Sequence, residues 1–470
     1  MIKFGTGGWR AIIADEFTKE NIRLLTAGLC ALMEKEGFSG ATVCLGYDRR
    51  FLSKESMFWA AEVLAGYGFR PYVINRSSPT PMIMSTVRQM GLPYGMAITA
   101  SHNPAIYNGI KIFTAGGRDA DKSVTRKIEA EIEKLRPEDV KSIPYAQALA
   151  AGIIREGYPF NEYIDSILDL VDTEMIKQAR LRIAIDPMYG VGHSSLRTIL
   201  LTCRCDVDVL HEQHDTLFGG RMPAPSADAL KLLRDYVVDN HCHLGIATDG
   251  DADRLGVIDE NGQYLHANTL LVLLYYYLLR YRGRSGPCVR NNSTTHLLDR
   301  VAADFGQECH EVPVGFKYIS AKMAETDAII GGESSGGMAV KGHIPGKDGI
   351  YAAALLVEML AITGKTVGQL YREITDRYGM LHYDEVSCRM TAQRKEALQQ
   401  RIFRDRQIPG FTEPVSRIDW SDGCKILFEG GSWVICRFSG TEPLLRIAAE
   451  GSTPHQVRNL IQIWQNFLEQ

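Results

Sequence analysis

The sequence has no apolar run long enough to cross a membrane. Its longest apolar stretch, residues 269–279, stops at Arg280, well short of the roughly 20 apolar residues that a spanning helix needs. The first residues, Met1-Ile2-Lys3-Phe4-Gly5-Thr6, contain no apolar signal region. We therefore expect no membrane partner and a cytoplasmic location.

Cysteine is also scarce, and neither sign of charge dominates. Ten cysteines in 470 residues are too few for a disulfide scaffold. Cys30, Cys44 and Cys436 lie in apolar segments, where buried, reduced thiols are expected. Lys and Arg number 52 against 56 Asp and Glu, a net charge of -4, so no overall charge attracts nucleic acid or an anionic membrane. Any anion binding must be local.

The remaining composition is that of a folded protein with several domains. Hydrophobic residues make up 45% and charged residues 23% of the chain, as in ordinary globular proteins. At about 150 residues per domain, 470 residues predict three or four domains. Strand and helix patterns alternate through most of the chain, which indicates α/β domains.

The pattern predicts three α/β cycles and a different C-terminal part. The expected strands of the cycles are 41–48, 72–75, 95–100 and 109–114; 181–186, 206–210 and 243–249; and 287–291, 308–313 and 327–332. A charged helix is expected at 122–136. From about His382, strands at 425–429, 432–438 and 444–450 followed by a helix from Pro454 suggest a small α+β domain.

The three cycles end alike, with an apolar strand and then a small polar loop. These loops are Ser101-His102-Asn103-Pro104, Asp249-Gly250-Asp251-Ala252-Asp253-Arg254 and Gly332-Glu333-Ser334-Ser335-Gly336-Gly337. Open α/β sheets bind ligands at such strand ends. We therefore predict three related α/β domains with mixed sheets and a smaller α+β domain, at 1–150, 151–260, 261–378 and 379–470.

The loop 249–254 carries the densest charge. Three carboxylates alternate with small residues, and hard divalent cations prefer several such oxygens. A calcium EF-hand fits in part because Glu260 falls at loop position twelve, but Arg254 replaces the glycine of position six and both flanks read as strands. We expect Asp249, Asp251 and Asp253 to bind Mg²⁺; the alternative is a solvated acidic turn.

Two further loops are candidates for phosphate chemistry. Ser101 would stand at a strand end as a nucleophile, although a serine hydrolase fits poorly without a Gly-x-Ser-x-Gly elbow, and the tetrapeptide can be an ordinary turn. Arg437-Phe438-Ser439-Gly440-Thr441-Glu442-Pro443 joins two strand patterns. Its backbone N–H groups, hydroxyls and arginine could hold a phosphate, or it could be a hairpin turn.

Two other patterns resemble a nucleotide-binding loop and a zinc site only in part. Gly5-Thr6-Gly7-Gly8-Trp9-Arg10 is glycine-rich but does not match a nucleotide-binding loop. His241-Cys242-His243 with Cys203 and Cys205 suggests zinc, but no paired C-x-x-C spacing occurs and the side chains would alternate across a strand. A packed strand edge is the simpler interpretation.

Taken together and in order, four signatures resemble the α-D-phosphohexomutase family of phosphoglucomutases and phosphomannomutases. They are Thr99-Ala100-Ser101-His102-Asn103-Pro104, the loop 249–254, Gly332-Glu333-Ser334-Ser335-Gly336 and the loop 437–443. The signatures lie at domain-sized separations, and the resemblance covers essentially the whole chain. It implies four domains around a central cleft.

The resemblance also implies roles for particular residues. Ser101 would be the phosphoserine, and Asp249, Asp251 and Asp253 would bind one Mg²⁺ together with a phosphoserine oxygen. Catalytic roles would extend to Arg10, His102, Lys111 and Lys347, with Arg254 as an additional site residue. Sugar hydroxyls would be held by Glu333 and Ser335, and the distal phosphate by Arg437, Ser439, Gly440 and Thr441, with Lys317 as a further substrate-binding residue.

One departure leaves the acid and base roles open. Many phosphomannomutase relatives have a histidine at the end of the third loop, where this chain has Gly337. Lys347, in Gly346-Lys347-Asp348-Gly349, resembles a lysine of glucose-specific relatives, and Lys111 could serve the opposite step. Gly315-Phe316-Lys317 is also closer to the phosphoglucomutase pattern than to the Gly-Asp-Arg of phosphoglucosamine mutases.

The resemblance implies a Mg²⁺-dependent enzyme that interconverts hexose 1-phosphates and hexose 6-phosphates, with glucose phosphates as the expected substrates. A hexose 1,6-bisphosphate would activate Ser101 by phosphorylating it. The alternatives are a phosphomannomutase or dual-specificity enzyme and, in a different class, an inactive sugar-phosphate-binding regulator. The sequence leaves a monomer or a dimer open.

Overall fold

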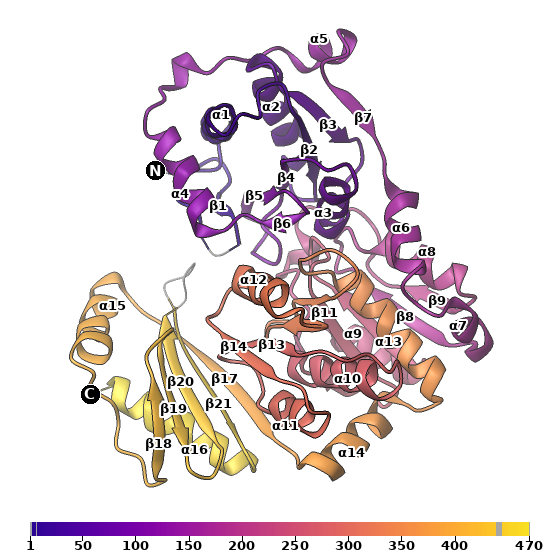
Figure 1. Ribbon diagram of the computed structural model, residues 1–470, viewed down its shortest axis with the longest axis vertical. Coiled ribbons are helices and arrows are strands. Elements are labelled where there is room, and N and C mark those ends of the chain that lie inside the picture. The colour runs from indigo at the N-terminus through magenta and orange to yellow at the C-terminus, as the bar shows by residue number, and fades with distance from the viewer. Residues whose placement is uncertain (1, 6, 439–443, 470) are drawn as a thin grey trace. The chain divides into compact units, whose positions relative to one another are not determined.

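The computed structural model describes residues 2–5, 7–438 and 444–469, apart from the side chain of Ala392. The chain divides into two compact units. The first comprises residues 1–270 and 335–368, and the second comprises 271–334 and 369–470. Each unit contains two β-sheets, with helices packed against them (Figure 1).

The first sheet of the first unit runs in the order β1-β5-β4-β2-β3-β7, with β6 paired to β5. Strands β4, β2, β3 and β7 are parallel, whereas β5 is antiparallel to β1 and β4, so the sheet is mixed. Its strands are β1 (Trp9–Ile12), β2 (Thr42–Tyr47), β3 (Arg70–Ile74), β4 (Tyr94–Ile98), β5 (Tyr107–Thr114), β6 (Arg118–Asp119) and β7 (Arg155–Gly157).

Helices accompany this sheet and bury its apolar side chains. They are α1 (Lys19–Lys35), α2 (Ser53–Gly66), α3 (Thr80–Gln89), α4 (Lys122–Ile132) and α5 (Tyr145–Ala150). Every residue of β4 is buried, and a Cβ added at Gly95 would lie 2.3 Å from Val87 Cγ2 of α3. The close helix–strand approach fixes the point at which β4 ends and the Ser101 loop begins.

The second sheet of this unit has the order β12-β11-β10-β8-β9. Strand β10 is parallel to β8 and antiparallel to β11, so this sheet is also mixed. Its strands are β8 (Arg182–Asp186), β9 (Asp206–Val209), β10 (Leu244–Thr248), β11 (Leu255–Asp259) and β12 (Tyr264–Leu265). The helices are α6 (Phe160–Leu168), α7 (Thr173–Ala179), α8 (His193–Thr202), α9 (Lys231–Asp239) and α13 (Gly349–Thr363), and strand β16 (Met338–Val340) also lies in this unit.

The second unit contains a small parallel sheet in the order β14-β13-β15. Its strands are β13 (Cys288–Asn291), β14 (Cys309–Val312) and β15 (Ile330–Gly332), with helices α11 (Leu297–Asp304) and α12 (Phe316–Thr326). Helices α10 (Ala267–Arg280) and α14 (Val367–Tyr378) begin in the first unit and continue into the second. The Tyr275-Tyr276-Tyr277 side chains of α10 are buried.

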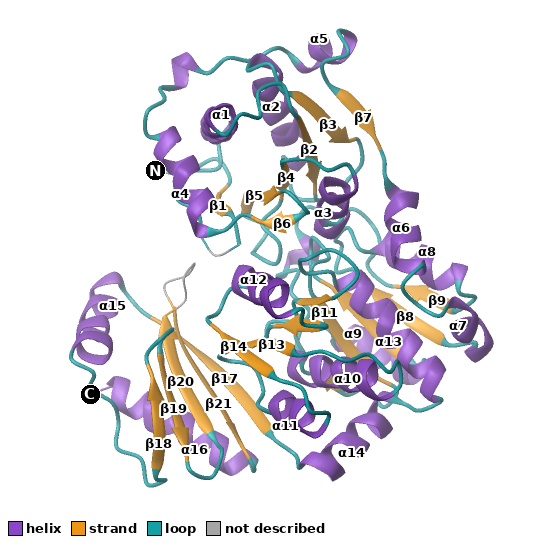
Figure 2. Ribbon diagram, viewed as in Figure 1, coloured by secondary structure: helices purple, strands orange, loops and turns teal. Residues whose placement is uncertain are grey.

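The C-terminal sheet is antiparallel, with the order β17-β21-β20-β19-β18 (Figure 2). Its strands are β17 (His382–Arg389), β18 (Val415–Asp419), β19 (Cys424–Phe428), β20 (Trp433–Phe438) and β21 (Leu444–Gly451). Helix α16 (Pro454–Glu469) packs on it through Val457, Leu460, Ile461 and Trp464, and α15 (Ala392–Leu398) precedes a short π-helix. This is the predicted α+β arrangement.

Several local expectations need correction. The helix expected at 122–136 ends at Ile132, and the strand expected at 327–332 begins only at Ile330, because Asp327 adopts a left-handed φ of 57° that ends α12. His241-Cys242-His243 precedes β10 and does not lie in a strand, although its burial alternates as expected. Cys30, Cys44 and Cys436 are buried free thiols, as predicted.

No single helix in the described ranges is long and apolar enough to cross a bilayer, although the bent pair α13 and α14 would pass on length and composition.

Candidate functional site

The loop that follows β10 gathers three buried carboxylates. Asp249, Asp251 and Asp253 are each no more than 1% exposed. Each offers one oxygen, and these oxygens lie within 4.8 Å of one another. A solvated acidic turn is therefore excluded.

The loop conformation depends on close packing against the Ser101 loop. A Cβ at Gly250 would lie 2.7 Å from the carbonyl oxygen of Ser101. Ala252 takes a left-handed φ of 61°, so successive carboxylates turn to the same side of the loop. Glycine at position 250 is thus required by the close approach of the Ser101 carbonyl.

Two lysines from other elements pair with these aspartates. Lys111 Nζ, from β5, lies 2.7 Å from both Asp251 Oδ2 and Asp253 Oδ2. Lys347 Nζ lies 2.7 Å from Asp253 Oδ2. Burial alone would raise the pKa of Asp253, but the charges of Lys111 and Lys347 hold it well below its usual value.

The donor set fits a hard divalent cation. Asp251 Oδ1 and Asp253 Oδ1 are buried without a hydrogen-bond partner in the described part of the chain, and such orphaned acceptors are rare. Burial and the charges of the two neighbouring aspartates raise the pKa of Asp249 to about 8. A bound cation would satisfy the free oxygens and offset this repulsion.

Ser101 stands directly beside this group. It follows β4, is fully buried, and has a left-handed φ of 53°, which is uncommon for a non-glycine residue. Its Oγ donates to Asp249 Oδ2 at 2.8 Å and lies 3.4 Å from His102 Nδ1. The structure thus brings together the serine and aspartate loops that the sequence placed 148 residues apart.

Sequence reasoning missed the residue that holds the Ser101 loop in shape. Arg50, just after β2, donates through Nη2 to the carbonyls of Ser101 at 2.7 Å and Asn103 at 2.6 Å. Its Nη1 donates to the carbonyls of Pro104 and Tyr107, both at 3.0 Å. Asp48 Oδ2 lies 3.3 Å from its Nε. The Asp48-Arg49-Arg50 triplet at a strand end was the available signal.

We expect Arg50→Lys to lower kcat by roughly 10-fold to 100-fold, because a lysine cannot bridge four carbonyls and the serine loop loses its position. The Mg²⁺ affinity should stay within about threefold of the parent, since the hydrogen bonds and the ion pair of Arg50 in the described chain go to Asp48 and to carbonyls of the serine loop, and none goes to the three aspartates. Steady-state kinetics and metal titration of Arg50→Lys, beside Arg155→Lys as an exposed control, check this. A parent-like kcat in a folded Arg50→Lys protein would show that the clamp is dispensable.

Arg10, His102 and Arg254 complete the surroundings of Ser101. Arg10 on β1 donates from Nη1 to Asn103 Oδ1 at 2.6 Å, and burial and the Arg254 charge lower its pKa to about 10. Burial and the charge of Arg254 also hold the pKa of His102 well below its usual value. His102 is therefore neutral near pH 7, and the fixed positive charge comes from arginine and lysine.

Lys347 is positioned by the start of α13. Asp348 caps this helix by accepting from the backbone N–H groups of Ile350 and Tyr351. The other oxygen of Asp348 accepts from Tyr163 Oη and contacts His343 Nε2, both at 2.8 Å. These buried partners hold the residue after Lys347, and sequence reasoning did not single them out.

The third loop is divided between the two units. In the first unit, Leu255 N donates to Gly336 O at 3.2 Å, and the backbones of Arg254 and Gly337 form an isolated antiparallel β-bridge. Ser335 is the residue just before this paired segment. In the second unit, Glu333 is 7% exposed and accepts from Gly315 N at 3.1 Å. Lys317 lies in the first turn of α12.

The fourth loop is described only at its edges. Strands β20 and β21 pair antiparallel on either side of it. Arg437 Nε lies 3.5 Å from Asp422 Oδ2, which also accepts from Val314 N at 2.8 Å. Ser439, Gly440 and Thr441 lie outside the described residues.

Comparison with known proteins finds the same family along the chain. Four models of phosphoglucomutase/phosphomannomutase match: α/β/α domain I at residues 1–139, domain II at 161–262, domain III at 266–378 and the C-terminal domain at 385–463. The domain boundaries drawn from sequence remain predictions.

Individual relatives cover nearly all of the chain. A phosphoglucomutase/phosphomannomutase of Thermococcus kodakarensis is 30% identical, over 99% of this chain and 98% of the relative. A phosphoglucosamine/phosphogalactosamine mutase of Sulfurisphaera tokodaii is 29% identical over 99% of both. A crystal structure described as a phosphomannomutase of Thermus thermophilus has 29% identity and a TM-score of 0.87, with 100% of this chain and 99% of that chain covered.

Proposed function

The chain belongs to the α-D-phosphohexomutase (phosphoglucomutase/phosphomannomutase) family, and from this premise we propose that it interconverts glucose 1-phosphate and glucose 6-phosphate. As a phosphohexomutase it is an isomerase that transfers a phosphoryl group within its substrate.

One observation carries the proposal. Ser101 Oγ lies 2.8 Å from Asp249, within a buried group of three carboxylates that two lysines flank. Phosphoryl transfer requires positioning and neutralisation of charge more than additional covalent catalysis. A nucleophile, a cation site and fixed ammonium groups are therefore the parts that this chemistry needs.

In the proposed reaction, Ser101 Oγ carries the phosphoryl group. A hydroxyl oxygen of the hexose monophosphate attacks the phosphorus, the P–O bond to Ser101 breaks, and a hexose 1,6-bisphosphate forms. After the bisphosphate reorients, its other phosphoryl group returns to Ser101 Oγ. Asp249, Asp251 and Asp253 would hold Mg²⁺, which when bound supplies neutralisation of the phosphoryl oxygens.

The two lysines have different surroundings and therefore different roles. Burial opposes the charge of Lys111, but Asp251 and Asp253 raise its pKa, so Lys111 keeps its proton and stabilises charge. Lys347 pairs with Asp253 and stands at the start of α13. We assign to Lys347 Nζ the exchange of the substrate hydroxyl proton, in the role left open by Gly337.

The choice of glucose follows from the third domain. Gly315-Phe316-Lys317 and Gly346-Lys347 resemble glucose-specific members more than the phosphoglucosamine pattern. Mannose phosphates are the second candidate, because the Thermococcus relative carries both names. A regulator without turnover is disfavoured, since mere binding needs neither the strained Ser101 nor three buried aspartates.

A coupled assay tests the sugar directly. Glucose, mannose, glucosamine and N-acetylglucosamine 1-phosphates should be compared with Mg²⁺ and glucose 1,6-bisphosphate as primer. We expect the highest kcat/KM with glucose 1-phosphate and the next with mannose 1-phosphate. A higher value with glucosamine 1-phosphate would overturn the assignment of the sugar while leaving the family intact.

Arg437 tests the proposed anchor for the phosphate that is not transferred. Loss of a two-pronged charged contact should cost about 2 to 4 kcal/mol, so Arg437→Ala should lower kcat/KM roughly 30-fold to 1000-fold. Metal affinity should be unchanged, because the aspartates belong to the first unit. Steady-state kinetics measure kcat/KM and a metal titration measures the affinity, with Arg458→Ala, at an exposed position, as the control. If kcat/KM of Arg437→Ala stayed within twofold of the parent, this loop would be an ordinary hairpin turn.

A further inference from the structure

The first unit contains a polar cavity whose lining includes none of the serine, aspartate or lysine residues of the site described above. Its volume is about 200 Å³, and its walls include Arg49, Arg76, Tyr158 and the first turn of α8, which contributes His193, Ser194 and Ser195. None of the described residues that line it is acidic. A cavity with two arginines and several hydroxyls, and no carboxylate, has the composition of an anion site.

We propose that this cavity binds the phosphate group of a small organic phosphate or free phosphate. The proposal concerns a second ligand and stands on the cavity alone, independently of the sugar assigned to the mutase site.

Ser195 supplies the most direct indication of a ligand. Ser195 is among the residues that line the cavity, and it is only 1% exposed. Its Oγ has no hydrogen-bond partner among the described residues. Buried hydroxyls are nearly always paired, so an oxygen of a bound anion is the partner that this hydroxyl lacks.

Helix α8 adds backbone donors on the same side. It spans ten residues and begins after Gly192, and no side chain within the described chain caps it. The N–H groups of its first turn are thus available, and the positive end of the helix dipole favours a negative charge. His193, Ser194 and Ser195 all belong to this turn.

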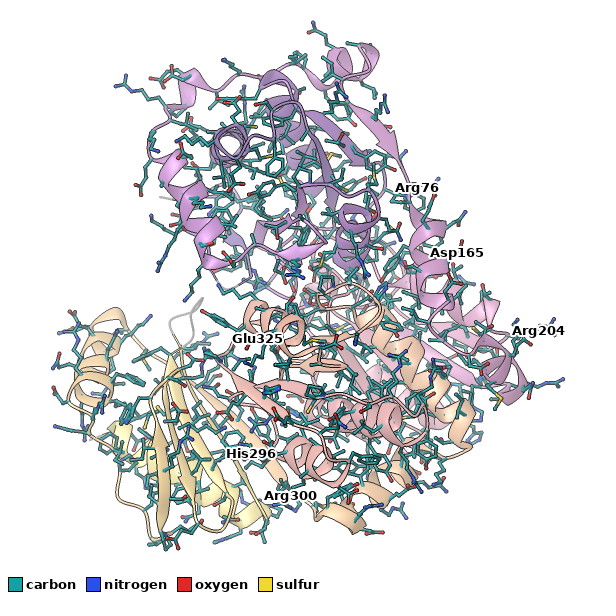
Figure 3. The ribbon with its side chains drawn as sticks, viewed as in Figure 1. Arg76, Asp165, Arg204, His296, Arg300 and Glu325 are labelled. Atoms are coloured by element: carbon teal, nitrogen blue, oxygen red, sulfur yellow. The ribbon has the colours of Figure 1, made fainter. Side chains whose placement is uncertain are left out.

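One of the two arginines is held by hydrogen bonds, and the guanidinium of the other is available to an anion. Arg49 is fixed, because its Nη1 donates to the carbonyl of Glu212 at 2.8 Å and its Nη2 lies 3.3 Å from His193 Nε2. Arg76 has no hydrogen bond or ion pair from its guanidinium within the described ranges and lies over the Tyr158 ring, 4.9 Å from its centroid. Figure 3 shows it at the surface, beside the segment between β7 and α6.

Positive charge dominates this corner of the unit. Burial and the neighbouring Arg49 lower the pKa of His193 to about 4, so the imidazole is neutral and serves as a hydrogen-bonding group. The nearby carboxylate of Glu212 lies 3.5 Å from Arg197 and does not line the cavity. An anion would therefore meet guanidinium charge that no carboxylate of the described lining opposes.

The cavity walls continue into the backbone that supports the aspartate loop. Val191 N donates to Gly250 O at 3.2 Å. Pro79 precedes Thr80, whose Oγ1 donates to Asp251 Oδ2 at 2.6 Å. The backbone of the cavity wall is therefore linked to the aspartate loop by hydrogen bonds.

The size of the cavity restricts the ligand. Pockets for drug-sized ligands occupy roughly 300 to 1000 Å³, and this one is smaller. It has room for a phosphate with a short carbon chain. Inorganic phosphate and glycerol 3-phosphate are therefore the probes, and they separate a free-ion site from a monoester site.

The test is calorimetric titration of both probes into the whole protein and three variants. Arg76→Ala removes the unengaged guanidinium and should weaken the tighter-binding probe roughly tenfold or more. Ser195→Ala should weaken it at least threefold while leaving the melting temperature unchanged or higher, because an unpaired buried hydroxyl is removed. Arg155→Ala, an exposed arginine on β7 outside the cavity, should bind like the parent.

The outcomes separate this site from the mutase site. Weaker binding in Arg76→Ala and Ser195→Ala, with parent-like turnover of glucose 1-phosphate, supports a second site. Identical titrations in the parent and both variants, or no heat from either probe in the millimolar range, overturn it. Failure of turnover in the parent protein would count against the proposed function and would leave the titrations interpretable.

Discussion

Replacing Ser101 by alanine should reduce kcat at least about 1000-fold, because it removes the group that we propose accepts and returns the phosphoryl group. The hydroxyl lies 2.8 Å from Asp249, and the Arg50 side chain holds the Ser101 backbone by donating to its carbonyl. Steady-state turnover of glucose 1-phosphate with Mg²⁺ and a bisphosphate primer measures this effect.

The variant should remain folded and able to bind metal. Alanine fits the space of the serine, and the three carboxylates stay in place, so the melting temperature should change little. Exposed Ser123, in α4, provides the control: Ser123→Ala should turn over like the parent. A fully active Ser101→Ala would refute the proposed mechanism.

The second large effect is expected from the cation site. Asp251→Asn should lower Mg²⁺ affinity roughly tenfold or more and turnover roughly 100-fold or more, because a hard cation needs charged oxygen ligands. The same change weakens the 2.7 Å contact with Lys111, which loses a charged partner. The Mg²⁺ affinity and the turnover number, both measured on one preparation, should therefore decrease together.

A control variant with the same change of charge separates the loss of a metal ligand from the loss of one negative charge on the protein. Asp165, on α6, is exposed and labelled in Figure 3, so Asp165→Asn should leave both quantities unchanged. Excess chelator should abolish turnover of the parent, and added Mg²⁺ should restore it. Unchanged activity in chelator would overturn the metal assignment.

The strands that were predicted well are those whose burial is visible in the sequence. All five residues of β4 and of β10 are buried, so each appears as a short apolar run before a polar loop. Strands β17 and β18 were missed, since most of their residues are only partly buried or exposed. Pairing with β21 and β19 holds them in the sheet, and no local pattern reveals that pairing.

The residues of the candidate site also divide into those with a local sequence pattern and those without one. Ser101, Asp249, Asp251 and Asp253 could be named because small residues and carboxylates at strand ends have a local signature. Arg50 was missed although Asp48-Arg49-Arg50 stands at a strand end, because its role consists of contacts with a loop more than 50 residues away. The cavity beside α8 could not be predicted from the sequence either, since Arg76, Tyr158 and Ser195 come together only in the fold.

The most direct test of the account is to locate the phosphoryl group. The protein should be incubated with glucose 1,6-bisphosphate and Mg²⁺ and then analysed by intact mass and peptide mapping. We predict one added phosphoryl group, on the peptide that contains Ser101, and its disappearance when glucose 1-phosphate is added. A phosphoryl group on any other residue, or none in a protein that turns over, would contradict the mechanism.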